Sequence, residues 1–135
     1  MQWKIKPRPT DKLWTDYLRL RDKNICFWCG NKIFNKRNSG VSHYWNRTKE
    51  STRYEDDNCD LMCNIPCHQK AEHEKKIKGF DGAEYDGEYT KKKKNQLGKK
   101  RFNELMVLAH TTKKRDDKID KIILEAKLND HQNKN

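Results

Sequence analysis

Two pairs of cysteines have the spacing of a metal site. Cys26 and Cys29 are separated by two residues, which lets both thiolates reach one tetrahedral ion. Downstream, Cys63 and Cys67 are separated by three residues, within the range found in zinc sites, and Cys59 with Cys63 is a competing pair at the same spacing. We predict that the first pair together with Cys63 and Cys67 holds one structural Zn²⁺, and that Cys59 is the spare thiol.

A second set of residues has side chains that could carry out phosphodiester cleavage. His43 lies in a β-like segment, Asn58 follows fifteen residues later, and His68 comes directly after a cysteine of the zinc site. A histidine accepts a proton near neutral pH, so His43 is predicted to be the general base. We predict that His68 holds a catalytic Mg²⁺ or Mn²⁺, and that Asn58 ties the loop that orients His43. Glu72 lies four residues after His68, on the same helix face, and is the candidate second metal ligand.

Basic residues near and beyond this set are predicted to contact DNA phosphates. Arg47 and Arg53 flank the loop next to the predicted site, and a guanidinium matches phosphate oxygens bidentately. The remaining predicted DNA contacts lie in one basic run and are Lys91, Lys92, Lys93, Lys94, Lys99, Lys100 and Arg101.

The composition also favours metal and nucleic acid as partners. The 135 residues include 31 Lys and Arg against 20 Asp and Glu, a formal net charge of +11 that attracts a polyanion. Only 23 residues are Leu, Ile, Val or Phe, too few for apolar burial alone to hold the fold. A structural zinc, which contributes an apparent ~10–16 kcal/mol, can compensate for this poor core. Without an export signal or a long apolar run, we expect a cytoplasmic protein with no membrane partner.

Short elements must position these residues. Apolar residues at three- and four-residue spacing between 13 and 18 predict a first helix, capped by Thr10 or Asp11 and ending near residue 24. Two short strands are expected to flank the loop at 49–52. A helix over 67–78, stopped by Gly79, then completes a β-β-α arrangement.

The second half of the chain is predicted to be a loop followed by helices. Two Asp-Gly pairs without periodicity indicate a loop from residue 80 that leads into the basic run. A last helix from about Asp116 is predicted to bury one face, formed by Ile119, Ile122, Ile123 and Ala126. The expected organisation is one domain with an N-terminal arm and helix, a zinc-bound core, a loop and basic segment, C-terminal helices and a frayed tail, over residues 1–24, 25–79, 80–101, 102–129 and 130–135.

Several segments together resemble the NinG/Rap family of phage recombination nucleases. The matching segments are RDKNICFWCG (21–30), SHYWNRTKESTRY (42–54), DN (57–58), CH (67–68), QLG (96–98) and FNEL (102–105). The resemblance covers residues 11–110. Many HNH sites have an acidic or histidine metal ligand just before the base, whereas this chain and the family it resembles have a serine there, Ser42.

The resemblance implies a small α+β fold with a zinc-stabilised ββα-metal (HNH) core, flanked by N-terminal and C-terminal helices. It implies an endonuclease acting on branched DNA such as Holliday junctions, in the host cytoplasm if the chain is phage-encoded. By position, His43 would be the general base, Asn58 the motif asparagine and His68 the ligand of the catalytic metal. Symmetric cutting of a four-way junction needs two sites, so we expect a homodimer, formed through the helices after Phe102.

Other interpretations fit the same residues. One is an HNH nuclease that nicks linear duplex DNA. Another is a non-catalytic zinc module that binds DNA or RNA through its basic face, and a third is an inhibitor or adaptor that uses the zinc fold as a scaffold.

Overall fold

The computed structural model describes residues 7–133, which form a mixed α+β fold with two small antiparallel sheets. In chain order the helices and strands are α1 (Pro9–Arg21), β1 (Ser39–His43), β2 (Cys59–Cys63), α2 (Gln69–His73), β3 (Lys76–Lys78), β4 (Glu84–Asp86), α3 (Glu88–Ala109) and α4 (Asp117–Asn133). Short helical turns, η1 (Lys36–Asn38), η2 (Glu50–Thr52), η3 (Asp56–Asn58) and η4 (Asn64–His68), lie in the connections. The α+β class and the β-β-α order of the central part agree with the prediction. Residues 1–6 of the predicted arm and 134–135 of the predicted tail lie outside the described residues.

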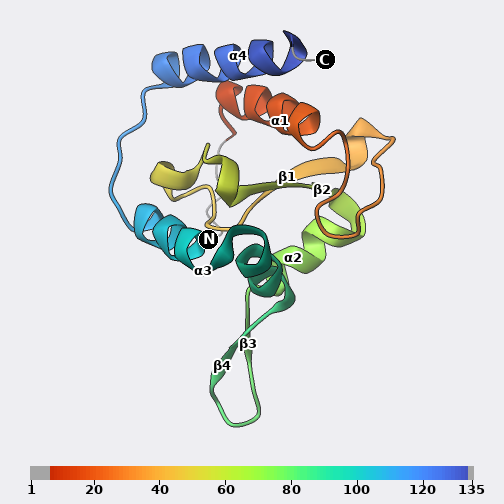
Figure 1. Ribbon diagram of the computed structural model, residues 1–135, viewed down its shortest axis with the longest axis vertical. Coiled ribbons are helices and arrows are strands. Elements are labelled where there is room, and N and C mark those ends of the chain that lie inside the picture. Colours follow the sequence, from red (N-terminus) through yellow and green to blue (C-terminus); the bar gives the residue numbers. More distant parts are fainter. Residues whose placement is uncertain (1–6, 134–135) are drawn as a thin grey trace.

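The sheet of β1 and β2 separates two layers of helices. The strands pair antiparallel, with His43 opposite Cys59. Because side chains alternate along a strand, Val41 and Cys59 pack against Trp14 of α1, whereas Met62 packs in a second cluster with residues of α3. Figure 1 shows α1 and α3 on opposite sides of this sheet.

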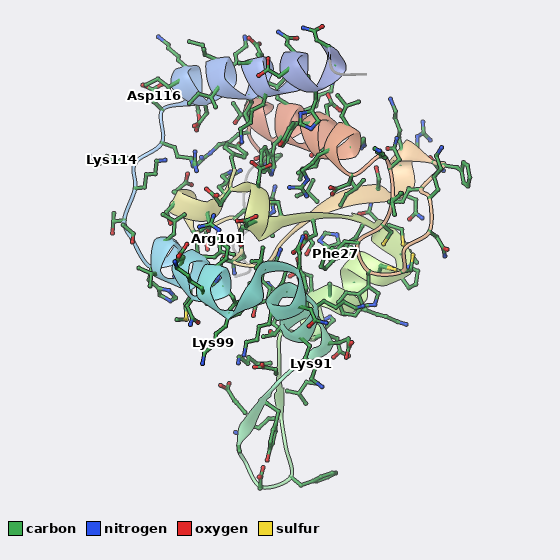
Figure 2. The ribbon with its side chains drawn as sticks, in the orientation of Figure 1. Phe27, Lys91, Lys99, Arg101, Lys114 and Asp116 are labelled. Carbon is green, nitrogen blue, oxygen red and sulfur yellow. The ribbon has the colours of Figure 1, made fainter. Side chains whose placement is uncertain are left out.

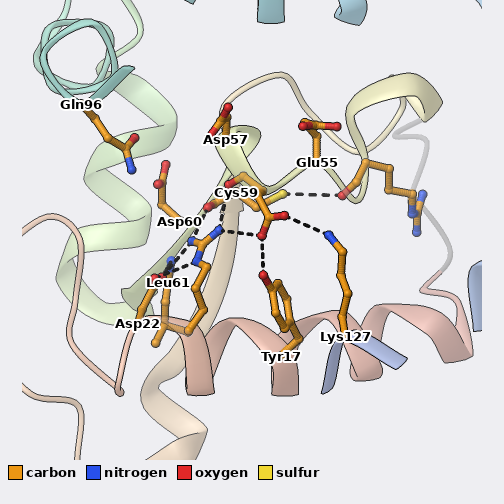
Figure 3. A network of polar contacts seen from close by, with 12 residues as sticks. Tyr17, Asp22, Glu55, Asp57, Cys59, Asp60, Leu61, Gln96 and Lys127 are labelled. Carbon is orange, nitrogen blue, oxygen red and sulfur yellow. Dashed lines mark hydrogen bonds and ion pairs between the residues drawn. The ribbon is translucent and has the colours of Figure 1, made fainter. Parts of the chain in front are cut away.

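The first helix has its predicted buried face, but it begins before the predicted cap residues, because Arg8 is the N-cap and Thr10 and Asp11 lie in the first turn. Trp14, Tyr17 and Leu18 are buried along one face of α1, and the helix ends at Arg21. α4 lies across the outer side of α1 (Figure 1). Asp56, in η3, ties the layers together, since its carboxylate accepts hydrogen bonds from the Tyr17 hydroxyl at 2.7 Å and from Lys127 of α4 at 2.9 Å (Figure 3).

The predicted buried face of the last helix is wrong. Ile119, Ile122 and Ile123 are exposed by 56%, 67% and 49%, and α4 instead packs on α1 through Leu124, which is 2% exposed. Helical spacing identifies an apolar stripe but not the side of the helix that meets the domain. Here two ion pairs turn the opposite side of α4 toward the body. They join Asp120 to Arg115, at 3.0 Å, and Lys127 to Asp56.

The predicted helix over 67–78 is shorter than expected. α2 ends at His73, and residues 76–78 form β3, which pairs with β4 in a hairpin that projects from the body (Figure 1). An ion pair of 2.6 Å between Lys76 and Asp86 closes the base of the hairpin. The first Asp-Gly pair, at 81–82, therefore lies in the turn between two strands, and the second, at 86–87, leads into α3.

The basic run is helical and not part of a loop, which corrects the predicted 80–101 segment. α3 begins at Glu88 and runs to Ala109, with an interruption at Gly98, whose φ of 78° is readily adopted only by glycine. The inward face of its first half consists of Tyr89, Thr90 and Lys93, which apolar periodicity does not detect. Long unbranched lysines also lose little side-chain freedom in a helix.

The C-terminal tail is helical further than predicted. α4 continues to Asn133, and the ring of His131 meets the ring of Tyr17 edge-on at 5.1 Å. This contact extends the α4–α1 packing beyond residue 129. Within residues 7–133, no helix combines the length and the apolar character needed to cross a membrane.

Candidate metal centre and adjoining cavity

The structure brings together the four cysteines of the predicted zinc site. Their sulfurs all lie within 4.8 Å of one another, and the members are Cys26, Cys29, Cys63 and Cys67. The first two come from a tight turn closed by a hydrogen bond from the Gly30 N–H to the Cys26 carbonyl, at 2.9 Å. The others come from the end of β2 and from η4. Four thiolates at this separation can hold a metal ion such as zinc.

Cys26 is the thiol best prepared to bind a metal. Burial raises its pKa, but hydrogen bonds from the backbone N–H groups of Cys29, Cys63 and Trp28 outweigh this and lower the pKa to about 7. The thiolate is the form that binds metal, so these N–H groups favour binding.

Cys59 lies outside the cluster, as predicted. Its side chain is fully buried, and its thiol donates a hydrogen bond to the carbonyl of Arg53 at 3.5 Å. Burial raises its pKa to about 12, so it stays protonated. On geometry and on charge state, Cys59 is a structural thiol.

A cavity of about 420 Å³ lies between α1, β1 and the η4–α2 segment. Its lining includes the predicted base His43 and the predicted metal ligands His68 and Glu72. His43 lies more than twenty residues before the two ligands in the chain. The other lining residues are Asp11, Trp14, Thr15, Val41, Asn46 and Arg47. The fold therefore brings the predicted base and the predicted ligands of the catalytic metal to one space.

His43 is held in one neutral form. Its Nε2 lies 3.0 Å from the carbonyl oxygen of Arg53, which can only accept, so Nε2 carries the hydrogen and Nδ1 keeps its lone pair. Burial lowers the pKa of His43 to about 4, although the Arg53 carbonyl opposes this shift. At neutral pH the imidazole is therefore uncharged and able to accept a proton through Nδ1.

Asn58 fixes the loop between the two strands. Its side-chain amide donates to the carbonyls of Trp45 at 2.9 Å and Thr52 at 3.1 Å, while its Oδ1 accepts from the Trp45 N–H at 2.8 Å. These bonds close the segment that follows His43 onto the one that carries Arg53. Asn58 is completely buried, so it acts on the orientation of the loop and does not reach the cavity.

His68 and Glu72 form a pair at one side of the cavity. Nε2 of His68 lies 3.5 Å from Oε1 of Glu72, and a hydrogen bond from His68 is the largest of the effects that lower the pKa of Glu72. Both side chains are partly exposed, so an imidazole nitrogen and a carboxylate are accessible to a cation. Ser42 is completely buried and absent from the cavity lining, so it is not available as a ligand.

Arg53 does not contact solvent, which corrects its predicted role on DNA. It is 2% exposed, and its guanidinium binds the carboxylate of Asp11 through Nη2 at 2.7 Å and Nε at 3.2 Å. Asp11 also accepts from the Tyr54 hydroxyl at 2.8 Å. The sequence pattern identified Asp11 only as a helix cap and gave no signal for this role. Arg47 remains at the cavity, 3.7 Å from the same carboxylate.

The basic run divides into engaged and exposed side chains. Lys93 is buried and pairs with Asp60 at 3.2 Å, Lys94 pairs with Asp86 at 2.6 Å, and Arg101 pairs with Asp57 and with Glu55. Lys93 is thus a structural residue, which corrects its predicted DNA contact. Lys91, Lys99 and Lys100 are exposed, and Lys92 is half-buried beside Trp28. Figure 2 shows Lys91 and Lys99 extending from α3 into solvent.

Comparisons with protein-family models, with curated proteins and with solved structures find no match to this chain.

Proposed function

We propose that this chain is a metal-dependent HNH endonuclease that hydrolyses DNA phosphodiester bonds, at branched recombination intermediates such as Holliday junctions. The observation that supports cleavage is the shared cavity, where a neutral His43 with an available Nδ1 lies with His68 and Glu72. The branch preference rests on the resemblance to the NinG/Rap family. The four thiols support a structural zinc beside the segment that carries His68.

In this proposal His43 activates water. Nδ1 accepts a proton as the water oxygen bonds to phosphorus, and the P–O bond to the leaving oxygen breaks. The Arg53 carbonyl holds the Nε2–H and stabilises the imidazolium that forms. Arg47 lies at the cavity where it can bind phosphate oxygens. Mg²⁺ or Mn²⁺ held by His68 and Glu72 would stabilise the charge that develops on the phosphate and the leaving oxygen.

The test is cleavage of a labelled four-way junction and a matched linear duplex, each with Mg²⁺, Mn²⁺ or EDTA. We expect metal-dependent cutting of the junction by the wild type, and loss of at least about a hundredfold in rate in His43→Ala. His68→Ala should show a similar loss. His73→Ala is the matched control, because His73 is exposed on α2 and absent from the cavity lining.

Zinc content and far-UV circular dichroism of each variant separate loss of chemistry from loss of fold. Equal cutting of both substrates would support the linear-duplex nuclease. Binding without cutting in either metal, or full activity in His43→Ala, would contradict the nuclease proposal and favour the non-catalytic zinc module.

A further inference from the structure

The outer side of α4 carries a continuous apolar stripe. Ile119, Ile122, Ile123 and Ala126 recur at the spacing of one helix face, and all are exposed. Single exposed apolar residues are ordinary, but three isoleucines on adjacent turns form a patch of the kind that marks an interaction site.

The fold leaves this stripe largely exposed, although Ile119 and Ile123 also border a hollow beside Tyr54. The inward side of α4 is occupied by Leu124 and by the ion pairs of Asp120 and Lys127, so the helix is already fixed on α1. Those residues lie about a quarter turn or more around the helix from the centre of the isoleucine stripe. A rotation that buried the isoleucines on α1 would break both ion pairs and expose Leu124. The stripe is therefore available to a second molecule.

The charged residues beside the stripe can pair with those of a second copy. Lys118 and Glu125, both exposed, are seven residues apart and so lie on the same flank. If a second α4 packs antiparallel, Ile119 of one copy can meet Ile123 of the other. In that register Lys118 lies beside Glu125 of the second copy, and the two-fold axis repeats the pair. In a parallel two-fold arrangement this flank would face the opposite flank of the second copy, so Lys118 and Glu125 would not meet.

We propose that this face of α4 is a homodimer interface, formed by antiparallel pairing with α4 of a second copy. Both signs of charge flank the stripe, which fits a second copy better than a polyanion such as DNA. Because each chain carries a formal charge of +11, remote repulsion opposes association and salt screens it. The proposal does not depend on nuclease activity.

Sedimentation velocity over a series of protein concentrations, with zinc bound, tests the interface. We expect a concentration-dependent dimer in the wild type, and a dissociation constant raised by about tenfold or more in Ile122→Asp. Ile77→Asp is the matched control, because Ile77 is 46% exposed but lies on β3, outside the helices after Phe102. A wild type that stays monomeric at every concentration, or an Ile122→Asp dimer as tight as the wild type, would overturn the proposal.

Charge reversal tests the antiparallel register. Lys118→Glu and Glu125→Lys should each weaken the dimer, because each places like charges opposite one another. The double variant should restore association toward the wild-type level. If the double variant is as weak as the single variants, the proposed pairing is wrong. Thermal unfolding monitored by circular dichroism verifies that each variant keeps its helices.

Discussion

His43 combines a proton-accepting nitrogen with an environment that disfavours its charge. The Arg53 carbonyl assigns the hydrogen to Nε2, and burial lowers the pKa of the ring to about 4. A general base with a low pKa is fully available at neutral pH but pulls weakly on a proton. Bound phosphate next to the ring would raise this pKa, since a nearby anion favours the protonated form.

The depressed pKa of His43 predicts a pH-dependent stability. The pKa of the ring is about 4 in the folded protein and about 6.5 in the unfolded chain, so between these values the unfolded state binds more protons. The stabilisation is therefore complete above pH ~6.5 and is lost as the pH falls toward the folded-state pKa. Compared with His43→Asn, the wild type should lose roughly 2 kcal/mol of unfolding free energy between about pH 7 and about pH 5.

Urea unfolding of both proteins at each pH measures this difference. The comparison with His43→Asn cancels the shared effect of pH on the cysteine site. An equal pH slope in the two proteins would contradict the buried, neutral state of His43.

The division of roles among the cysteines predicts different metal contents in two serine variants. Cys67→Ser should lose zinc, because Cys67 belongs to the four-thiol cluster, whereas Cys59→Ser should keep one zinc per chain. Atomic absorption on purified protein gives the stoichiometry. Loss of zinc in Cys59→Ser with zinc retained in Cys67→Ser would reverse the assignment of these two thiols.

Among the secondary-structure elements, α1 connects the cavity to the loop that supports His43. Asp11 neutralises the buried guanidinium of Arg53, and the carbonyl of the same Arg53 holds His43. The first turn of α1 thus sets the position of a peptide more than forty residues away in the chain. The helix is a wall of the cavity and also a support for the proposed base.

Replacing Asp11 with Asn should destabilise the protein by about 3 kcal/mol, because it removes the nearest carboxylate from a buried guanidinium and leaves only Glu50, at 3.8 Å, as a countercharge. Asp16→Asn is the matched control on the same helix. Its carboxylate pairs with Arg19 at a more exposed position, so a change within about 0.5 kcal/mol is expected. Chemical denaturation provides both values, and equal stabilities of the two variants would contradict the support role of Asp11.

Across the whole protein, the excess positive charge is only partly available to a ligand. Several basic side chains of α3 are used in ion pairs that fasten this helix and the β3–β4 hairpin to the body. The exposed lysines of α3 lie on the layer opposite α1, across the sheet (Figure 1).

DNA binding should therefore depend on salt through the exposed lysines. Replacing both Lys99 and Lys100 with Ala should reduce the slope of log affinity against log salt by about 0.9 for each phosphate that a lysine no longer neutralises. Lys94→Ala is the matched control, because Lys94 is engaged with Asp86. Fluorescence anisotropy over a salt series measures the slopes, and an unchanged slope in the double variant would exclude α3 as a phosphate-binding surface.

The features that depend on local chemistry could be predicted from the chain alone. The Cys-x-x-Cys turn, the two strands, the buried face of α1 and the pairing of Cys63 with Cys67 follow from spacing along a few residues, because turn geometry and helix periodicity are local. The order of His43, Asn58 and His68 also selected the residues that meet around or support the cavity.

Which charged and apolar side chains are buried depends on the tertiary structure alone. Arg53 and Lys93 have the same side-chain chemistry as surface cations, and their burial depends on carboxylates that are distant in sequence, Asp11 and Asp60. The isoleucines of α4 have the spacing of a core face, yet they point outward because ion pairs and Leu124 orient the helix. Such choices depend on long-range contacts, which no local pattern contains.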